Sequence, residues 1–144
     1  MTMDTKALQE HIVLHGLWLA GTGGARADLR GANLRRATLS RANLRGADLR
    51  RANLNEPNLG VYVIVQTGPI GSRRDQLVSM WHPDWPQEEV RTGCFTGTLA
   101  TLAAQVTSTY PPAASGAEPK SGSEYAAAIS YHRAILGLHG WRGA

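Results

Sequence analysis

The chain has 144 residues, of which 42% are apolar and 6% aromatic, enough for about one domain with a modest core. Its single cysteine excludes an internal disulfide, and no apolar run reaches the length of a membrane span, so we expect a protein of the reducing cytoplasm. Residues 26–56 hold eight arginines and three acidic residues, a net charge of +5, whereas the rest holds seven basic and eight acidic residues, a net −1. The basic part of the chain is therefore this one segment.

The first predicted element is a short amphipathic helix over residues 4–19. Its apolar residues recur at spacings of three and four, Asp4 is placed to cap its N-terminus, and the glycines within residues 21–24 end it. His11 and His15 lie one turn apart, a spacing that suits a metal ion, but no third ligand accompanies them. We therefore assign both histidines to packing and capping. They also interrupt the N-terminal apolar run, and no basic leader precedes it, which argues against a signal peptide.

A five-residue repeat follows, from about residue 25 to residue 59. In the stretch ADLRGANLRRATLSRANLRGADLRRANL, residues 27–54, leucine stands at every fifth position, with alanine two places before it and usually Asp or Asn one place before it. Neither the three-and-four spacing of a helix nor the two-residue spacing of a strand explains this period. A short, fixed repeat indicates an array, in which each unit becomes stable by stacking on its neighbours.

The C-terminal part of the chain has no repeat and predicts an α+β domain. β-branched and aromatic runs separated by Gly and Pro turns predict a three-stranded meander over residues 61–67, 76–81 and 90–92. Apolar residues at helical spacing predict two helices, over residues 98–108 and 123–138. Between these helices, residues 110–123 form a polar, Pro- and Gly-containing segment that we expect to be a mobile loop.

The repeat resembles a known family. The copies ADLRG, ANLRR, ATLSR, ANLRG, ADLRR and ANLNE, followed by the degenerate PNLG, are similar to the pentapeptide repeat family, whose pattern is A(D/N)LXX. The lead-in HGLWLAGTGGARADL resembles the helix and glycine turn that precede such repeats in proteins of bacteria and their phages. The tail, with GPIGSRRD, RTGCFTGTL and EYAAAI, resembles a small domain that follows the repeats in phage and prophage proteins.

The resemblance implies a mainly β fold with an α+β tail: a short right-handed β-helix of square cross-section, in which four pentapeptides form one coil. The repeat leucines would fill its axis, namely Leu29, Leu34, Leu39, Leu44, Leu49, Leu54 and Leu59, with the repeat alanines beside them. Coils stacked at about 4.8 Å would bring together residues twenty apart. The pairs expected on this basis are Arg30 with Arg50, Asp28 with Asp48, Asn33 with Asn53, and Arg36 with Glu56.

Fewer than two coils cannot bury enough apolar surface to offset the cost of ordering the chain, so we expect both ends to be capped. The expected organisation is a capping helix and glycine turn over residues 1–24, a coil over residues 25–60 and an α+β domain over residues 61–144, folding as one cooperative unit. Leu14, Leu17 and Trp18 are the expected capping residues at one end of the coil. The strand that begins at residue 61 would cover the other end.

Neither the residues nor the resemblance predicts catalysis, and we expect a protein that is not an enzyme and needs no cofactor or metal. Cys94 has no His and Asp at a recognisable spacing, so we interpret it as a buried structural residue. The remaining histidines, His82, His132 and His139, form no ligand spacing either.

The arginines are the main candidates for a binding surface, because the planar guanidinium pairs with phosphates and carboxylates through two hydrogen bonds. The candidate partner-binding residues are Arg30, Arg35, Arg36, Arg41, Arg45, Arg50, Arg51, Arg73, Arg74 and Trp85. Two simpler interpretations stay open: the arginines form only a solvated surface, and Trp85 packs onto the meander instead of anchoring a partner.

We favour a non-catalytic binding protein of a phage or mobile element that inhibits a host nucleic-acid-handling or defence complex by protein–protein contact, for example an anti-CRISPR protein in the cytoplasm of a bacterium. Its partner would present an acidic or nucleic-acid-binding surface. One alternative is action on a type II topoisomerase, as in quinolone-resistance members of the family, although DNA mimicry there calls for a long acidic coil. The other is direct binding of nucleic acid through the arginines, with a steep dependence on salt. A homodimer formed through an exposed coil or sheet edge also stays open, and no membrane partner is expected.

Overall fold

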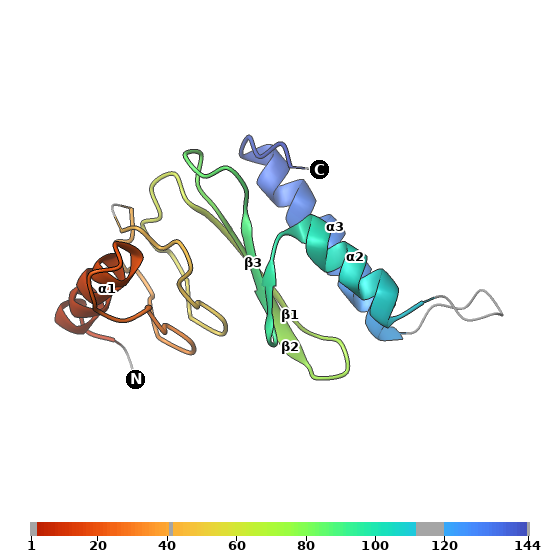
Figure 1. The fold of residues 1–144 in the computed structure, drawn as a ribbon, viewed down its shortest axis with the longest axis horizontal. Coiled ribbons are helices and arrows are strands. Elements are labelled where there is room, and N and C mark those ends of the chain that lie inside the picture. Colours follow the sequence, from red (N-terminus) through yellow and green to blue (C-terminus); the bar gives the residue numbers. More distant parts are fainter. Residues whose placement is uncertain (1–2, 41, 112–119, 144) are drawn as a thin grey trace. The chain divides into compact units, whose positions relative to one another are not determined.

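The computed structural model describes residues 3–40, 42–111 and 120–143 (Figure 1). The chain divides into two compact units. Unit 1, Met1–Val61, contains helix α1 and the five-residue repeat, and unit 2, Tyr62–Ala144, contains a four-stranded sheet with helices α2 and α3. In the described residues no helix is long and apolar enough to cross a membrane.

Helix α1, Thr5–Leu19, agrees with the predicted helix over residues 4–19. Asp4 caps it as expected, since its side chain accepts a hydrogen bond of 2.7 Å from the backbone N–H of Ala7. After the helix the chain reverses through a glycine turn in which Gly24 has a φ of 74°. A side chain at Gly24 would place its Cβ 2.2 Å from the carbonyl oxygen of Leu14, so only glycine fits there.

The repeat folds into a coil in which residues twenty apart lie side by side. Isolated parallel bridges join Asp28 to Asp48, Asn33 to Asn53 and Thr38 to Asn58. At the first of these bridges the backbone N–H of Leu29 donates to the carbonyl of Asp48 at 2.9 Å, and the N–H of Asp48 donates to the carbonyl of Ala27 at 3.1 Å. The pairings expected for Asp28 and Asn33 are therefore present. The next bridge has the same hydrogen-bond pattern.

The leucines of the first five copies form the axis of the coil. They are completely or almost completely buried: Leu29, Leu34, Leu39, Leu44 and Leu49. Leu54 and Leu59, which were also predicted to fill the axis, are only half-buried. The fully buried part of the axis therefore runs from Leu29 to Leu49.

In the copies from ADLRG to ANLNE, each described fifth residue lies at a corner of the coil and adopts left-handed backbone. The φ angles at Gly31, Arg36, Gly46, Arg51 and Glu56 lie between 52° and 77°. At each corner that ends in alanine, the alanine N–H donates to the carbonyl of the leucine three residues earlier, as in a type II turn. A corner every five residues leaves room for single bridges but not for long strands. This is why helices contain more residues than strands in a chain that was predicted to be mainly β.

Unit 2 is built on an antiparallel sheet in the order β1-β2-β3-β4. Its strands are β1, Val63–Ile70; β2, Asp75–Trp81; β3, Glu89–Thr92; and β4, Phe95–Gly97. The first three agree in position with the predicted meander, whereas β4 was not predicted. Gly93, with a φ of 53°, and Cys94 form a two-residue turn that pairs the ends of β3 and β4. Because β4 is only 3 residues long, no alternating pattern marks it in the sequence.

Helices α2, Leu99–Thr109, and α3, Lys120–Leu138, lie side by side against one face of this sheet (Figure 1). Thr98 caps α2 through a capping box with Thr101. Helix α3 begins three residues before its predicted start, within the segment predicted as a loop. Residues 112–119 of that segment lie outside the described residues, so its predicted mobility is not addressed.

Two buried polar side chains hold unit 2 together. Glu88 accepts hydrogen bonds from the backbone N–H of Leu99, at 2.8 Å, and from the indole N–H of Trp141, at 2.9 Å. His132 has no exposed surface, and its two ring nitrogens contact the hydroxyls of Ser79, at 2.5 Å, and Thr67, at 2.9 Å. Glu88 thus joins the start of α2 to the C-terminal segment, and His132 joins α3 to β1 and β2.

The environment of His132 predicts that stability falls in mild acid. Burial lowers the pKa of His132 from 6.5 to about 4, so between these values the unfolded chain binds a proton that the folded chain does not. The contribution of His132 is complete above about pH 6.5 and is lost as the pH falls towards 4, by on the order of 3 kcal/mol in total. Denaturant titrations between pH 8 and pH 4.5 measure it. The His132→Gln variant should lose this slope; an equal slope in the variant would show that another group causes it.

Candidate functional site: the arginine coil

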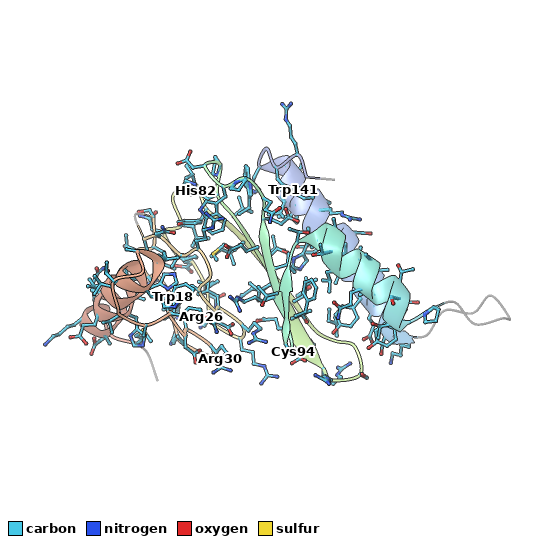
Figure 2. All side chains as sticks on the ribbon, viewed as in Figure 1. Trp18, Arg26, Arg30, His82, Cys94 and Trp141 are labelled. Atoms are coloured by element: carbon cyan, nitrogen blue, oxygen red, sulfur yellow. The ribbon has the colours of Figure 1, made fainter. Side chains whose placement is uncertain are left out.

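The described arginines of the repeat lie on several sides of the coil instead of forming one face. They occupy the fourth and fifth positions of the copies, next to or at the corners. With a register of twenty residues, Arg30 and Arg50 share one side, Arg35 lies on the next side, and Arg45 lies on the side that closes the coil. Figure 2 shows the side chains of this unit, with Arg26 and Arg30 labelled. A partner that contacts one side of the coil would therefore meet only some of these charges.

One side carries an alternating ladder of acids and arginines. The guanidinium of Arg30 donates two hydrogen bonds to Asp28, at 2.8 and 2.7 Å, and its Nε lies 3.9 Å from the carboxylate of Asp48. Arg50 donates to Asp48 in the same two-pronged manner, at 2.9 and 2.6 Å. Stacking of residues twenty apart would place Asp28 beside Asp48 and Arg30 beside Arg50. Because acids and arginines alternate along this side, each charged group instead has an opposite charge next to it.

The two rungs of this ladder differ in burial. The side chains of Asp48 and Arg50 are 2% and 21% exposed, whereas those of Asp28 and Arg30 are 54% and 58% exposed. Hydrogen bonding from Arg30 lowers the pKa of Asp28 from 3.8 to about 2, so this carboxylate stays charged at neutral pH. Both guanidinium groups already contact carboxylates of the coil itself.

A third arginine of the coil is also paired. The Nε of Arg36 lies 3.1 Å from a carboxylate oxygen of Glu56, which is the pairing expected from residues twenty apart. Both residues adopt left-handed backbone at equivalent corners. Both side chains are exposed, so this ion pair contributes little to stability, about 0–1 kcal/mol.

The other candidate residues are distributed over both units. Arg35, Arg45 and Arg51 are exposed on the coil, whereas Arg41 lies outside the described residues. Arg73 and Arg74 are exposed in the turn between β1 and β2, in unit 2, so they are not part of the coil surface.

Trp85 is not an isolated exposed anchor. Its ring is half-buried and meets the ring of Tyr62 edge to face, with ring centroids 5.7 Å apart, and the ring of His82 at 6.2 Å. Tyr62 and His82 are also in contact, at 4.8 Å. The three rings form one aromatic cluster, which agrees with the alternative in which Trp85 packs within its own domain.

The cap of the coil depends on His15, which the sequence assigned to packing and capping without identifying its partners. The ring of His15 is 1% exposed; its Nδ1 accepts the backbone N–H of Ala27 at 3.0 Å, and its Nε2 lies 2.8 Å from the carbonyl of Arg45. Only a neutral imidazole with its proton on Nε2 satisfies both contacts. Trp18 stacks on this ring at 5.5 Å. His15 therefore pairs two backbone groups of the coil that a purely apolar cap would leave without partners.

The predicted apolar cap is wrong in part. Leu14, Leu17 and Trp18 are 45%, 42% and 43% exposed, whereas Leu8 and His15 are the buried residues of α1. Gly46 is close to Trp18, since a Cβ there would lie 3.3 Å from the indole ring. The edge of a coil presents backbone polar groups, so it favours a side chain with one donor and one acceptor over leucine.

No catalytic arrangement is assembled by the remaining candidates. Cys94 was predicted to be buried, but it is exposed at the turn between β3 and β4, at the end of the sheet opposite to His82 and Trp141 (Figure 2). A two-residue turn places its second residue at the tip of the hairpin, which explains the error. His11 contacts the carbonyl of Ala7 within its own helix. In the part of the chain that the structure describes, no group of three or more His, Cys, Asp or Glu is placed to hold a metal ion.

The comparisons with known proteins match the repeat segment alone. Residues 25–56 match the family model described as Pentapeptide repeats, with 8 copies. The match covers the segment with the five-residue period and the twenty-residue pairing, so this segment consists of pentapeptide repeats. No curated protein and no solved structure matches the chain.

The role of His15 is tested by removing its polar atoms. His15→Leu would remove the hydrogen bonds that His15 makes with the N–H of Ala27 and the carbonyl of Arg45, and we expect it to lower the free energy of unfolding by about 2–4 kcal/mol. His11→Leu is the matched control, because it loses only a contact within α1, and should change stability by less than about 1 kcal/mol. Denaturant unfolding measures both. Equal losses would contradict a special role of His15.

The ladder predicts unequal effects of two chemically identical substitutions. Asp48→Asn removes the charge of a buried carboxylate between two guanidinium groups, and should lower the free energy of unfolding by about 2–4 kcal/mol. Asp28→Asn removes an exposed partner of Arg30 and should cost only about 0–1 kcal/mol. Thermal and denaturant unfolding at neutral pH compare the two. A larger loss for Asp28→Asn would show that burial does not rank these pairs.

Proposed function

We propose that the protein is a non-catalytic binding module of a phage or mobile element, which inhibits a host nucleic-acid-handling or defence complex through contacts made by its coil. The observation that carries this proposal is the concentration of arginines on the pentapeptide-repeat segment, which has a net charge of +5 in a chain whose remainder is net −1. The segment contains arginines but no lysine. The planar guanidinium group favours bidentate hydrogen bonding to carboxylates or phosphates.

The shape of the coil supports a protein partner. We infer that the repeat forms a right-handed β-helix with a square cross-section, because four copies of five residues separate the paired positions and each copy ends in a corner. Such a rod presents arginines of different sides to different directions. A complex with an acidic groove that surrounds the rod would contact several sides at once.

Three arginines of the coil are paired with acids of the coil itself. Arg30, Arg36 and Arg50 contact acids of the coil, so a partner has to displace those acids to bind the same atoms. Arg35 and Arg45 are exposed and lie on two other sides, so substituting both tests whether several sides of the coil contribute to binding. The alternative action on a type II topoisomerase is not favoured, because a net basic coil does not imitate the charge of DNA.

Direct binding of nucleic acid is the second candidate, and the positive charge of the coil favours it. It predicts an affinity that falls steeply with salt, because binding releases counterions from the phosphates. The coil lacks an aromatic platform for unpaired bases: its only rings belong to the capping helix, where Trp18 stacks on His15. We therefore place it second.

The test compares variants with equal loss of charge. Intact protein, Arg35→Gln/Arg45→Gln and the control Arg73→Gln/Arg74→Gln are each expressed in cells with an active CRISPR effector, and transformation by a targeted plasmid is counted. The same proteins are used as bait for the purified effector after nuclease treatment. We expect the intact protein and the control to raise transformation and retain the effector, and the coil variant to lose at least about tenfold of both effects, equivalent to 1.4 kcal/mol of binding.

Three other results would contradict the proposal. Loss of bait activity on nuclease treatment, with binding to duplexes abolished by salt, would establish direct nucleic-acid binding instead. If the protein inhibits the supercoiling reaction of a purified topoisomerase, the alternative described for quinolone-resistance proteins would be favoured. Full retention of both effects by Arg35→Gln/Arg45→Gln would mean that these coil arginines are only a solvated surface.

A further inference from the structure

Helix α1 has an apolar side that faces solvent. Four of its large side chains are exposed: Val13, Leu14, Leu17 and Trp18. They recur one turn apart, so they lie on one side of the last two turns of the helix, and we call them the outer patch. Among the described residues of the chain, only three other large apolar side chains are exposed. The outer patch is therefore the main concentration of exposed apolar side chains on the protein.

The packing of α1 onto the coil does not account for the outer patch. Leu8 and His15 are the buried residues of the helix, and the ring of His15 bonds to the coil. At 3.6 residues per turn they lie opposite to Val13 and Leu17. A surface helix usually carries polar residues on the side that faces away from the core. A cluster of apolar residues on that side marks an interaction surface instead.

The chain around the outer patch carries no charge. Residues 12–25 contain no Lys, Arg, Asp or Glu, and the glycine turn that follows the helix is exposed at residues 20–24. Towards the N-terminus, Glu10 and Lys6 lie on the same side of the helix, and their opposite charges offset each other. An apolar environment could thus receive the end of the helix and the turn without desolvating a charged group.

Two arginines lie beside the place where α1 joins the coil. The backbone groups that pair with the ring of His15 belong to Arg45 and to the residue after Arg26. Both arginines are exposed, and Figure 2 labels Arg26 and Trp18 in this unit. Trp18 is close to the residue after Arg45, since a Cβ at Gly46 would lie 3.3 Å from its ring. Unit 1 as a whole contains nine basic and five acidic residues, a net charge of +4.

This charge decides what would cover the outer patch. A second copy would bring two units of net +4 towards each other, with Arg26 and Arg45 beside the contact, so their charges would oppose association. The surface of an anionic lipid bilayer accepts both features: apolar side chains at the boundary of the acyl chains, and arginines among the headgroups. Tryptophan is also enriched at this boundary.

We propose that unit 1 binds the surface of an anionic lipid bilayer, with the outer patch inserted at the headgroup boundary and Arg26 and Arg45 among the headgroups. The sequence alone predicts no membrane partner, because no apolar run reaches the length of a span. Binding on the surface needs only an exposed apolar side, which the exposure of α1 supplies. The proposal goes beyond the proposed function, which does not use the outer patch.

Sedimentation with vesicles tests the apolar and the charged contributions separately. The full chain is mixed at low salt with vesicles of phosphatidylcholine, or of phosphatidylcholine and phosphatidylglycerol in equal parts. We expect the anionic vesicles to bind at least about tenfold more tightly than the neutral ones. Val13→Gln/Leu17→Gln should weaken binding to the anionic vesicles by at least about tenfold. The matched control Tyr131→Gln/Leu138→Gln, which replaces two exposed apolar residues of α3, should bind as the intact protein does.

Quenching of tryptophan fluorescence by brominated acyl chains tests insertion directly. The other tryptophans, Trp81, Trp85 and Trp141, belong to unit 2. We expect anionic vesicles with brominated chains to quench the intact protein. In Trp18→Phe, which keeps a ring beside His15, this quenching should disappear while binding persists. The quenching and the comparison of the two lipids use an unaltered helix or a single conservative change, so they decide the question even where Val13→Gln/Leu17→Gln is less stable.

Four results would overturn the proposal. They are the absence of binding to anionic vesicles, equal binding of the two double variants, and quenching that persists in Trp18→Phe. The fourth is a dimer in analytical ultracentrifugation that Val13→Gln/Leu17→Gln converts to a monomer, because a second copy would then cover the outer patch.

Discussion

The pairing of backbone groups twenty residues apart is the constraint on which unit 1 depends. It requires the chain to turn a corner in every copy, and each position of the repeat serves that turn. The second residue, Asp or Asn, accepts the N–H two residues later, as Asn33 does from Arg35 at 3.2 Å. The third, leucine, enters the axis. The fifth takes left-handed backbone, where glycine is favoured and arginine is strained, so Arg36 and Arg51 occupy the less favourable corners.

This constraint also decides how charge is presented. The described arginines beside the corners lie on several sides of the coil. Arg30 and Arg50 each pair with the acid two residues earlier, and the register also places Arg30 near Asp48. Part of the basic character is thus neutralised inside the unit, and Arg35 and Arg45 are exposed on other sides. A partner would recognise the coil by the spacing of these sides as well as by its net charge.

The sequence predicted features that follow from local repetition and missed those that depend on distant contacts. The buried leucines, the pairing of Asp28 with Asp48 and the cap of α1 by Asp4 follow from the five-residue period and from helix chemistry. His15 was assigned to packing and capping, but its partners were missed because they are backbone groups of the coil, 12 and 30 residues away. The exposure of Cys94 depends on β4, which is too short to leave a pattern.

Disulfide trapping tests the twenty-residue register most directly. In a Cys94→Ser background, Thr38→Cys/Asn58→Cys joins two bridged positions, and Thr38→Cys/Asn53→Cys joins positions on different sides of the coil. Chain entropy alone favours the shorter loop of the second pair. We predict that mild oxidation crosslinks the first pair within one molecule and leaves the second reduced, as measured by mass spectrometry of proteolytic fragments. Equal crosslinking, or preference for the second pair, would contradict the coil.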